Sequence, residues 1–474
     1  MLLSDLSEGS PPVEITALAY DSHSVAPGAL FFAVPGGQRD GHDHAAQAVA
    51  QGAAALVVER PLGLGVPEVQ VASTREAMAV FAARFNGDPS AKLRVIGVTG
   101  TNGKTTSTFL IRQLLEAGGI RTALLGTVKS VIGGRDGQVI HTTPEAIDLQ
   151  ASFAAMLDAG DEACAMEVSS HALALHRADA IHFEAALFTN LTQDHLDFHP
   201  TMEDYFAAKR RLFEAAPRIA IVNLDDPYGR RLKKDFPAAL GFALHARADY
   251  VASHLRSGIA DGSFTAQTPD GEIVIRTRLP GAFNAANALG ALAVAHQLGV
   301  PLAVISTALA RATPAPGRFQ ALDEGQPFAV LVDYAHTPDS LANVLTAARN
   351  LTSGRVIAVF GCGGDRDRGK RPQMGAIATR LAEVTIVTSD NPRSEEPEAI
   401  VDEILAGTRP DGAHAVEAIV ERRAAIARAI ELAQAGDVVV IAGKGHEQGQ
   451  EFAGGRKVPF DDVAVARELL PAGR

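Results

Sequence analysis

Residues 100–106, Gly-Thr-Asn-Gly-Lys-Thr-Thr, have the types and spacing needed to bind phosphate groups. Glycines let backbone N–H groups turn toward phosphate oxygens, and a helix that begins there adds partial positive charge. Lys104 is placed to reach β- and γ-phosphates, and Thr105 to bind Mg²⁺ through its hydroxyl. The loop is shorter than the usual G-x-x-x-x-G-K-[ST] pattern, since Val98 stands where a glycine would be. Against the alternative of a chance glycine turn, we predict a nucleoside triphosphate site.

The elements that position this loop follow in the order strand, loop, helix. Residues 93–99 are an apolar run typical of a buried strand, and residues 107–117 have the amphipathic pattern of a helix. Helical patterns alternate with further apolar runs, so mostly parallel α/β sheets are expected. The runs predicted to be strands are residues 29–34, 53–58, 163–168, 185–189, 219–223, 329–333, 356–360, 384–388 and 438–442.

The chain of 474 residues is longer than one compact core usually holds. Turn-forming residues 86–90 and the proline-rich residues 314–317 are candidate boundaries. We therefore predict an α/β protein of three domains. These are residues 1–90, residues 91–317 with the phosphate loop and a mostly parallel sheet, and residues 318–474 with a doubly wound, Rossmann-like fold.

Composition narrows the class of protein. The net charge of −12 argues against a general nucleic-acid binder. Neither a membrane-spanning apolar run nor a secretory signal is visible. Cys164 and Cys362 lack metal-type spacing, which favours a reduced, cytoplasmic protein.

Polar residues follow several predicted strands, where ligands gather in open α/β sheets. Glu167 could complete a Mg²⁺ shell with Thr105. Arg393 offers a planar fork for a carboxylate, and Glu447 a partner for an ammonium group. Taken singly, each has an ordinary alternative as a solvated side chain or surface ion pair. The same holds for His195, for Lys209 on a predicted helix, and for the basic loop at residues 361–371.

Together these segments resemble the Mur ligases of peptidoglycan synthesis, most closely those that add the third amino acid in its 2,6-diaminopimelate form. The resemblance covers nearly the whole chain and lies in the order of many motifs. Besides the phosphate loop they are Thr-Thr-Pro (142–144), Glu-Val-Ser-Ser-His-Ala-Leu (167–173), Asp-His-Leu-Asp (194–197), Tyr-x-x-x-Lys (205–209), Phe-Asn-x-x-Asn (283–287), Asp-Tyr-Ala-His-Thr-Pro (333–338) and Asp-Asn-Pro-Arg (390–393).

The resemblance implies a UDP-binding, an ATP-binding and an amino-acid-binding domain. It implies a cytoplasmic, monomeric enzyme whose partners are the small molecules ATP, UDP-N-acetylmuramoyl-L-alanyl-D-glutamate and meso-diaminopimelate, with no nucleic acid and no membrane insertion. ATP would convert the substrate carboxylate to an acyl phosphate, which the amine of the incoming amino acid would attack.

The resemblance also implies roles for residues at the ATP and metal sites. ATP would contact Gly100, Thr101, Asn102, Gly103, Lys104, Thr105, Thr106, Asn284, Asn287 and Asp333. Mg²⁺ would be held by Thr105, Glu167, His195 and a carbamylated Lys209 (N6-carboxylysine), with Lys104, Glu167, His195 and Lys209 counted as catalytic. Carbamylation turns a cation into an anionic oxygen ligand, which explains a lysine at a metal site.

Two further sets of residues match the family's substrate positions. The UDP-linked substrate would contact Ser22, Gly37, Gln38, Arg39, Thr142, Thr143, Ser169 and Arg177. Diaminopimelate would contact Arg371, Asp390, Asn391, Pro392, Arg393, Gly443 and Glu447, with Arg393 pairing its second carboxylate. Departures from the family pattern are His23, His141, Leu175 and Pro200, and the first three bear on the UDP-substrate contacts.

Alternatives stay open from the sequence. The amino acid could be L-lysine or L-ornithine. A folylpolyglutamate synthase would share the phosphate loop and carbamylated lysine, but residues 21–42 resemble the UDP-sugar domain that folate enzymes lack. A nucleotide-binding protein without ligase activity would be expected to lose Glu167, His195 or Lys209, and all three are present.

Overall fold

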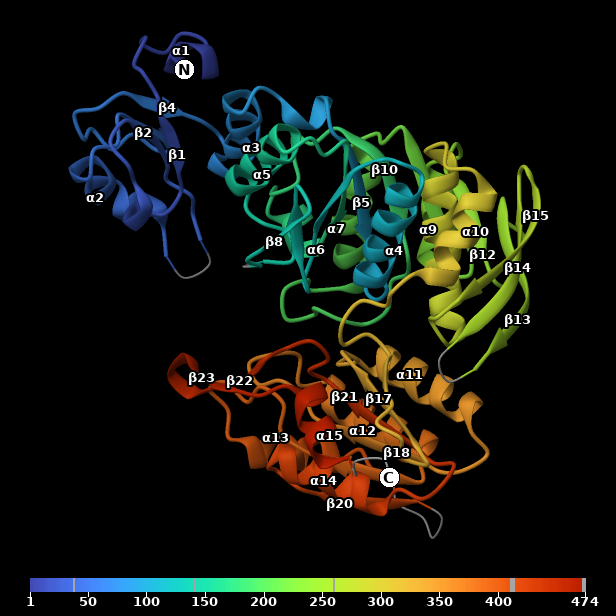
Figure 1. The fold of residues 1–474 in the computed structure, drawn as a ribbon. Helices are drawn as coiled ribbons and strands as arrows, with labels where there is room; N and C mark the ends of the chain where they lie inside the picture. Colours follow the sequence, from blue (N-terminus) through green and yellow to red (C-terminus); the bar gives the residue numbers. More distant parts are fainter. Residues whose placement is uncertain (37–38, 140, 259–260, 410–413, 471–474) are drawn as a thin grey trace. The chain divides into compact units, whose positions relative to one another are not determined.

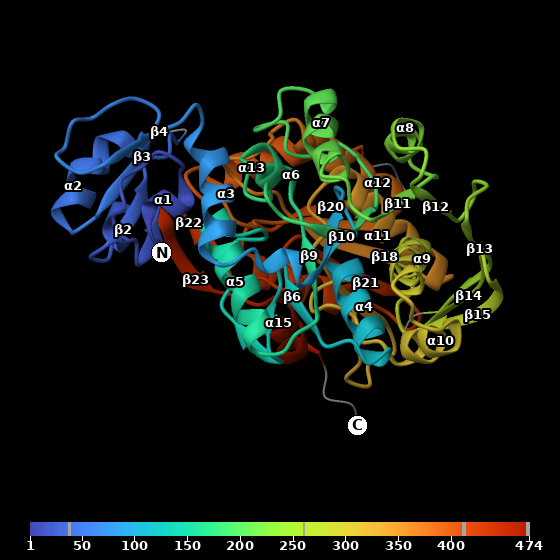
Figure 2. The same cartoon turned by 90° about the horizontal axis from the view of Figure 1, so that it is seen from above.

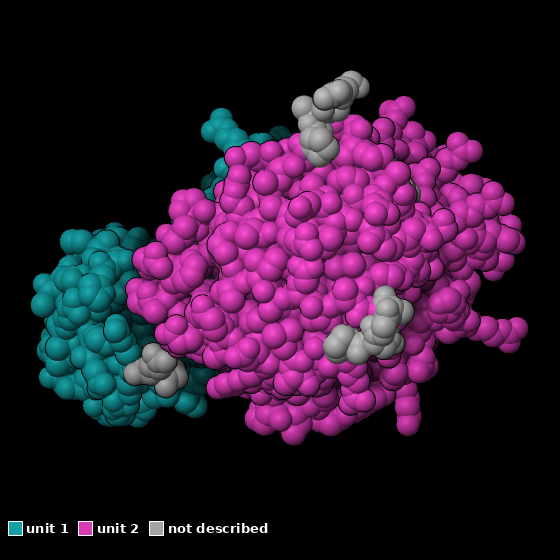
Figure 3. Space-filling model, turned by 90° about the horizontal axis from the view of Figure 1, so that it is seen from below, with its two compact units in different colours: residues 1–99, 120–186, 208–218 teal, residues 100–119, 187–207, 219–474 magenta. Residues whose placement is uncertain are grey.

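The computed structural model describes residues 1–36, 39–139, 141–258, 261–409 and 414–470 (Figure 1). They form two compact units (Figure 3). Unit 1 contains residues 1–99, 120–186 and 208–218, and unit 2 contains residues 100–119, 187–207 and 219–474. Strand β10 (Phe183–Phe188) and helix α7 (Met202–Glu214) each include a boundary between units. The domain boundaries expected near residues 90 and 317 stay a prediction.

Unit 1 begins with a parallel sheet in the order β1-β2-β3-β4. Side chains from both faces of β2 and β3 are buried, which explains why these strands read as unbroken apolar runs. The strands are β1 (Ala17–Ala19), β2 (Ala29–Phe32), β3 (Ala55–Val58) and β4 (Glu68–Gln70). The helices are α1 (Leu3–Leu6), α2 (Ala45–Ala50) and α3 (Thr74–Phe85), with 3₁₀ turns at Ser22–Ser24, Gly41–His44 and Pro89–Ala91.

The rest of unit 1 holds the strand that leads into the phosphate loop. Strand β5 (Arg94–Thr99) pairs in parallel with β9 (Ala163–Glu167), which pairs in parallel with β6 (Thr122–Leu125). The antiparallel strands β7 (Ser130–Ile132) and β8 (Arg135–Gly137) follow β6. Helix α5 (Ala146–Asp158) packs against α3, and the short helix α6 (Ser170–Ala174) follows β9.

Unit 2 contains the helix that follows the phosphate loop, α4 (Lys104–Ala117), which packs against α9 (Ala282–Gln297) and α10 (Leu302–Arg311) (Figure 2). Strands β11 (Ile219–Asn223), β12 (Leu240–Ala243) and β13 (Tyr250–Ser257) are parallel, with α8 (Pro227–Asp235) between the first two. The sequence did not predict the antiparallel extension from β13 through β14 (Gly262–Thr268) to β15 (Gly271–Thr277).

A second sheet of unit 2 has the order β16-β17-β21-β18-β19-β20, parallel except at β16. Separate apolar cores cover its two faces, as expected for a doubly wound fold. Strands are β16 (Gln320–Leu322), β17 (Ala329–Asp333), β18 (Val356–Phe360), β19 (Val384–Val387), β20 (Ala415–Ala418) and β21 (Val438–Ala442). Helices are α11 (Pro338–Leu351), α12 (Lys370–Leu381), α13 (Pro397–Leu405), α14 (Arg422–Leu432) and α15 (Asp462–Leu469). A hairpin of β22 (Gly449–Phe452) and β23 (Arg456–Pro459), joined by a 3₁₀ turn at Ala453–Gly455, precedes α15.

The predicted strands therefore form, several of them shortened at one end by a residue or two. Among the described residues, none of the helices combines the length and apolar character that crossing a bilayer requires.

Candidate active site

The phosphate loop needs glycine at positions 100 and 103. Gly100 and Gly103 have φ angles of +152° and +86°, which side-chain-bearing residues rarely adopt. A Cβ at Gly100 would lie 1.9 Å from Thr189 Oγ1, and one at Gly103 would lie 2.4 Å from Asn287 Oδ1. The loop is thus packed closely against its neighbours in unit 2 with no room for side chains at these positions.

Asn190 holds the same loop in place. The backbone N–H of Thr101 donates to Asn190 O, and that of Asn102 donates to Asn190 Oδ1, both at 2.9 Å. The Lys104 ammonium donates to Gly100 O at 2.9 Å and to Thr101 O at 2.8 Å. The lysine therefore lies over the loop, and its contact with phosphate stays a prediction.

Arg318 brings a cation to this loop that the sequence did not identify. Its guanidinium donates to Thr105 Oγ1 at 3.1 Å and lies 4.4 Å from the centre of the Tyr334 ring. The neighbouring Asp333 accepts a 2.6 Å hydrogen bond from Phe319 N. Burial raises the pKa of Asp333 to about 6, although Arg318 and hydrogen bonds from the backbone oppose this shift. The only sequence signal for Arg318 is its position after the linker at residues 314–317.

The two asparagines expected near adenine lie in the first turns of α9. Asn284 Nδ2 donates to Pro280 O at 2.8 Å, and Asn287 Nδ2 lies 3.4 Å from Asn284 Oδ1. Both side chains are buried. Asn287 thus lies beside the phosphate loop, while the adenine contact itself stays a prediction.

His195 follows β10 in a left-handed backbone conformation, with φ +55°. Its backbone N–H donates to Asp194 Oδ1 at 2.9 Å, and its Nε2 lies 3.3 Å from Asp194 Oδ2. Burial by itself would raise the pKa of Asp194, but His195, His336 and Lys370 hold that pKa below its ordinary value. Asp194 is therefore an ionised partner that orients His195, a role the sequence did not predict.

In unit 1, Glu167 ends β9 with its carboxylate fixed by Thr127. The Thr127 N–H donates to Glu167 Oε1 at 2.8 Å, and its hydroxyl donates to Oε2 at 3.2 Å. A Cβ at Gly126 would lie 2.5 Å from Glu167 Oε1, so glycine is required there. A buried, oriented carboxylate is a suitable ligand for Mg²⁺. Thr127 was not identified from the sequence.

Four residues expected at the UDP-linked substrate lie together beside Glu167. Thr143 Oγ1 donates to Glu167 O at 2.9 Å and accepts from Ser169 N at 3.1 Å. Arg177 Nη1 donates to Thr143 O at 3.3 Å. Two further contacts complete this cluster. The hydroxyls of Thr142 and Thr127 are hydrogen-bonded at 3.0 Å, and Arg177 Nε forms an ion pair with Glu145 Oε1 at 2.8 Å.

Other expected residues of unit 1 lie elsewhere. Ser22 is buried and donates to Gln47 Oε1 at 3.1 Å, whereas Arg39 is exposed. Gly37 and Gln38 lie outside the described residues. Lys209 is only 1% exposed. Within the described ranges, no three His, Cys, Asp or Glu side chains form a metal-binding cluster, and the expected ligand set of Thr105, Glu167, His195 and Lys209 stays a prediction.

The residues expected to bind the amino acid lie in unit 2, where Arg371 is in α12 and the others follow β19 and β21. Asn391 Nδ2 donates to Glu447 Oε2 at 2.8 Å. A Cβ at Gly443 would lie 3.2 Å from Asp390 Oδ2. The structure therefore joins the Asp-Asn-Pro-Arg loop to the Gly443–Glu447 loop. It also places Lys444, which the sequence did not identify, between them.

The two arginines expected here have internal partners. Arg393 Nε lies 3.2 Å from Glu451 Oε2, and Nη1 donates to Gly364 O at 2.7 Å. Arg371 is completely buried and pairs with Glu395 and Glu403. Arg393 is partly exposed, so it is the better placed of the two to meet a substrate carboxylate.

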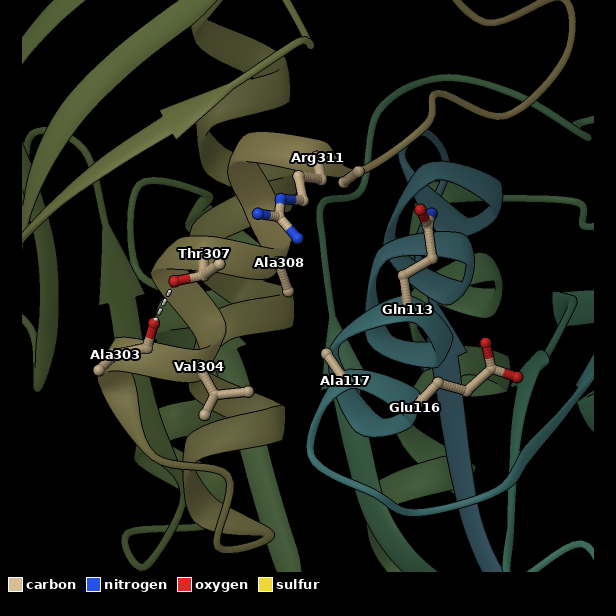
Figure 4. Close-up of a pocket in the computed structure, with 9 residues that line it drawn as sticks. Gln113, Glu116, Ala117, Ala303, Val304, Thr307, Ala308 and Arg311 are labelled. Atoms are coloured by element: carbon tan, nitrogen blue, oxygen red, sulfur yellow. Dashed lines mark hydrogen bonds between the residues drawn. The ribbon is translucent and has the colours of Figure 1, made fainter.

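A pocket of about 650 Å³ between α4 and α10 contains none of these residues (Figure 4). Its lining includes Gln113, Glu116, Val304 and Arg311. Gln113 Oε1 also accepts a 2.9 Å hydrogen bond from Thr313 N at the start of the linker. The pocket is thus separate from the expected active-site residues.

Three family models match successive parts of the chain. They are described as "Mur ligase family, catalytic domain" for residues 14–86, "Mur ligase middle domain" for residues 98–295, and "Mur ligase, glutamate ligase domain" for residues 317–445. The UDP-N-acetylmuramoyl-L-alanyl-D-glutamate--2,6-diaminopimelate ligase of Syntrophomonas wolfei is 46% identical over 99% of this chain and 97% of its own. The chain belongs to the Mur ligase family.

Other relatives agree with this assignment. This Mur ligase is 47% identical to the protein of the same name from Geobacillus kaustophilus, over 98% of this chain and 96% of that one. A solved structure of a UDP-N-acetylmuramoyl-L-alanyl-D-glutamate--2,6-diaminopimelate ligase is 35% identical, with a TM-score of 0.73 and coverage of 99% and 98%. The resemblance and the three-part α/β fold inferred from the sequence are confirmed.

Proposed function

We propose that this Mur ligase uses ATP to join meso-diaminopimelate to UDP-N-acetylmuramoyl-L-alanyl-D-glutamate. The observation that carries the choice of amino acid is the placement of Arg393 and Glu447 in two hydrogen-bonded loops at one sheet edge. A guanidinium suits a carboxylate, and a carboxylate suits an ammonium group. The distal end of diaminopimelate carries both groups, whereas lysine and ornithine lack the distal carboxylate. Relatives of the same length carry the name of this ligase.

The reaction proceeds in two displacement steps. The D-glutamate side-chain carboxylate attacks the γ-phosphorus of ATP, ADP leaves, and an acyl phosphate forms. The amine of the second substrate then attacks the acyl carbon, inorganic phosphate leaves with the bonding electron pair, and the amine loses a proton. The protein contributes positioning and neutralisation of phosphate charge.

We assign roles within this reaction to the phosphate loop and its neighbours. Lys104 and the backbone N–H groups of the loop bind the phosphates, and Asn287 helps seat the nucleotide. Thr143, Ser169 and Arg177 bind the UDP-linked substrate. The three domains follow the boundaries 1–90, 91–317 and 318–474, with UDP, ATP and the amino acid as their respective ligands.

The metal ligands are assigned from their chemistry. Mg²⁺, when bound, neutralises charge on the transferring phosphoryl group. Thr105 and Glu167 supply hard oxygen donors, and the fixed orientation of Glu167 by Thr127 supports this assignment. Two Mg²⁺ ions are proposed: Thr105 and Glu167 bind the first, and His195 and a carbamylated Lys209 bind the second. We also infer a cytoplasmic monomer, which agrees with two buried, free cysteines.

Phosphate release tests the proposal, with Mg²⁺, ATP and UDP-N-acetylmuramoyl-L-alanyl-D-glutamate and, in parallel, meso-diaminopimelate, L-lysine and L-ornithine. Turnover that requires diaminopimelate is the expected result. Turnover mainly with lysine or ornithine would support the ligase reaction but reject diaminopimelate as its amino-acid substrate. ATP hydrolysis that needs neither carboxylate nor amine would reject the ligase.

A further inference from the structure

Lys444 is an ammonium group buried beneath the two loops assigned to the amino acid. Its side chain is 0% exposed. Nζ lies 3.3 Å from Asp390 Oδ1, 2.9 Å from Asn391 Oδ1 and 3.0 Å from Glu447 Oε2. One side chain therefore contacts both loops, and it does so from the side away from solvent.

These contacts fix the orientation of the Asn391 amide. Asn391 Oδ1 accepts from Lys444 Nζ and from Glu451 N, the latter at 3.0 Å. The amide NH₂ must then point the other way, and it donates to Glu447 Oε2 at 2.8 Å. A reversed amide would place its NH₂ against the ammonium, so Lys444 excludes that arrangement.

The same contacts neutralise only part of the charge of the loops. Asp390 and Glu447 supply two carboxylates, and Lys444 supplies one cation. The Arg422 guanidinium nearby is already paired with Asp462. The cluster therefore has a net charge of −1. Its more exposed carboxylate is Glu447, which is 30% exposed, whereas Asp390 is 8% exposed. A single negative charge at the open side suits one substrate ammonium group.

We propose that Lys444 is a positioning residue that aims Glu447 and Asn391 at an ammonium group of the incoming amino acid and thereby sets the affinity for that substrate. The inference rests on the proposed function. Lys444 itself is too deeply buried to touch the substrate, so it acts through the two side chains it contacts.

The test compares two neutral variants, K444M and K444Q, with wild type and with K233M. Lys233 is a control lysine in helix α8, and its ammonium donates to the backbone carbonyls of Pro237 and Ala239. Steady-state kinetics give KM for diaminopimelate, ATP and UDP-N-acetylmuramoyl-L-alanyl-D-glutamate separately. Thermal unfolding and circular dichroism show which variants fold.

We expect KM for diaminopimelate to rise about tenfold or more in each folded neutral variant, because hydrogen bonds to charged groups are lost. KM for the other two substrates should stay within about twofold, as should every constant of K233M. K444R, which keeps the charge, should recover part of the affinity.

Two results would overturn the proposal while the function stands: an unchanged KM for diaminopimelate in a folded variant, or an equal rise in KM for all three substrates. Failure of both neutral variants to fold would show a purely structural role and overturn it too. If wild type itself turns over no amino acid, the proposed function fails, and this inference falls with it.

Discussion

The carboxylate of Glu167 accepts hydrogen bonds from both the backbone N–H and the hydroxyl of Thr127. The two contacts reach different oxygens, so they fix the plane of the carboxylate as well as its position. Partners that orient a metal ligand typically contribute 10- to 100-fold to metal affinity or activity. Thr127 is therefore part of the proposed Mg²⁺ site although it does not need to touch the ion.

Thr127→Val should lower activity about tenfold and raise the Mg²⁺ concentration needed for half-maximal rate, because one of the two contacts is lost. The backbone contact remains, so activity should not vanish. Phosphate release measured against Mg²⁺ concentration checks this. Thr307→Val, which removes a hydroxyl that donates to Ala303 O within α10, is the control. An unchanged Mg²⁺ dependence in Thr127→Val would contradict the role of Thr127.

Lys209→Ala should lose most activity, because the proposed second metal loses an anionic ligand. Bicarbonate cannot restore it, since there is no amine left to carbamylate, whereas a short carboxylate such as acetate should restore part of the rate. The intact mass of the native enzyme gives an independent readout, with one added carboxyl group expected. Wild-type activity in Lys209→Ala would reject the carbamate.

The strands that the sequence predicted are mostly apolar runs with buried side chains on both faces, as in β2 and β21. Short or partly exposed strands such as β4, β8 and β20 were not predicted. The strands β13, β14 and β15 were missed, since they carry exposed polar residues. Strand β13 is parallel to β12, and the antiparallel pairing begins only at β14.

At the site, residues inside a motif were found and their partners were not. Three such partners are hydrogen-bond donors that the sequence did not identify. They are Thr127, which donates to Glu167, Arg318, which donates to Thr105, and Lys444, which donates to Asn391. Thr127 can donate to Glu167 because β6 pairs with β9, which brings the residues after β6 next to the end of β9. This pairing cannot be predicted from the residue types alone.

Arg393→Ala should raise KM for diaminopimelate far more than KM for ATP, because the guanidinium is the proposed partner of the distal carboxylate. We expect at least about a 30-fold rise, typical of a lost charged hydrogen bond. Steady-state kinetics with each substrate varied in turn measure this. Arg467→Ala removes an exposed arginine paired with Glu324 and serves as the control. An unchanged KM for diaminopimelate would reject the pairing.

Asp333 should give the folding free energy a characteristic pH dependence. Burial raises its pKa to about 6 in the folded chain, from an ordinary value near 4. Between these values the folded state binds more protons than the unfolded state, so this group's contribution to stability falls as pH rises and is lost above about pH 6. Asp333→Asn removes the effect. The stability of the variant minus that of wild type should therefore increase by on the order of 3 kcal/mol from pH 4 to pH 7. Urea unfolding at several pH values tests this, and a difference independent of pH would contradict it.

The pair Arg422–Asp462 is completely buried and joins α14 to α15. Arg422 also donates to Ser389 O and Ala442 O, the residues directly before the two amino-acid loops. Asp462→Asn leaves a buried guanidinium without its counter-charge, which typically costs about 3–5 kcal/mol. We expect a lower urea midpoint and faster amide exchange in α14 and α15. The exposed pair Arg423–Glu468 joins the same two helices, so Glu468→Gln is a matched control that should leave both measurements nearly unchanged. Equal effects of the two substitutions would show that the buried Arg422–Asp462 pair contributes no more to stability than the exposed pair does.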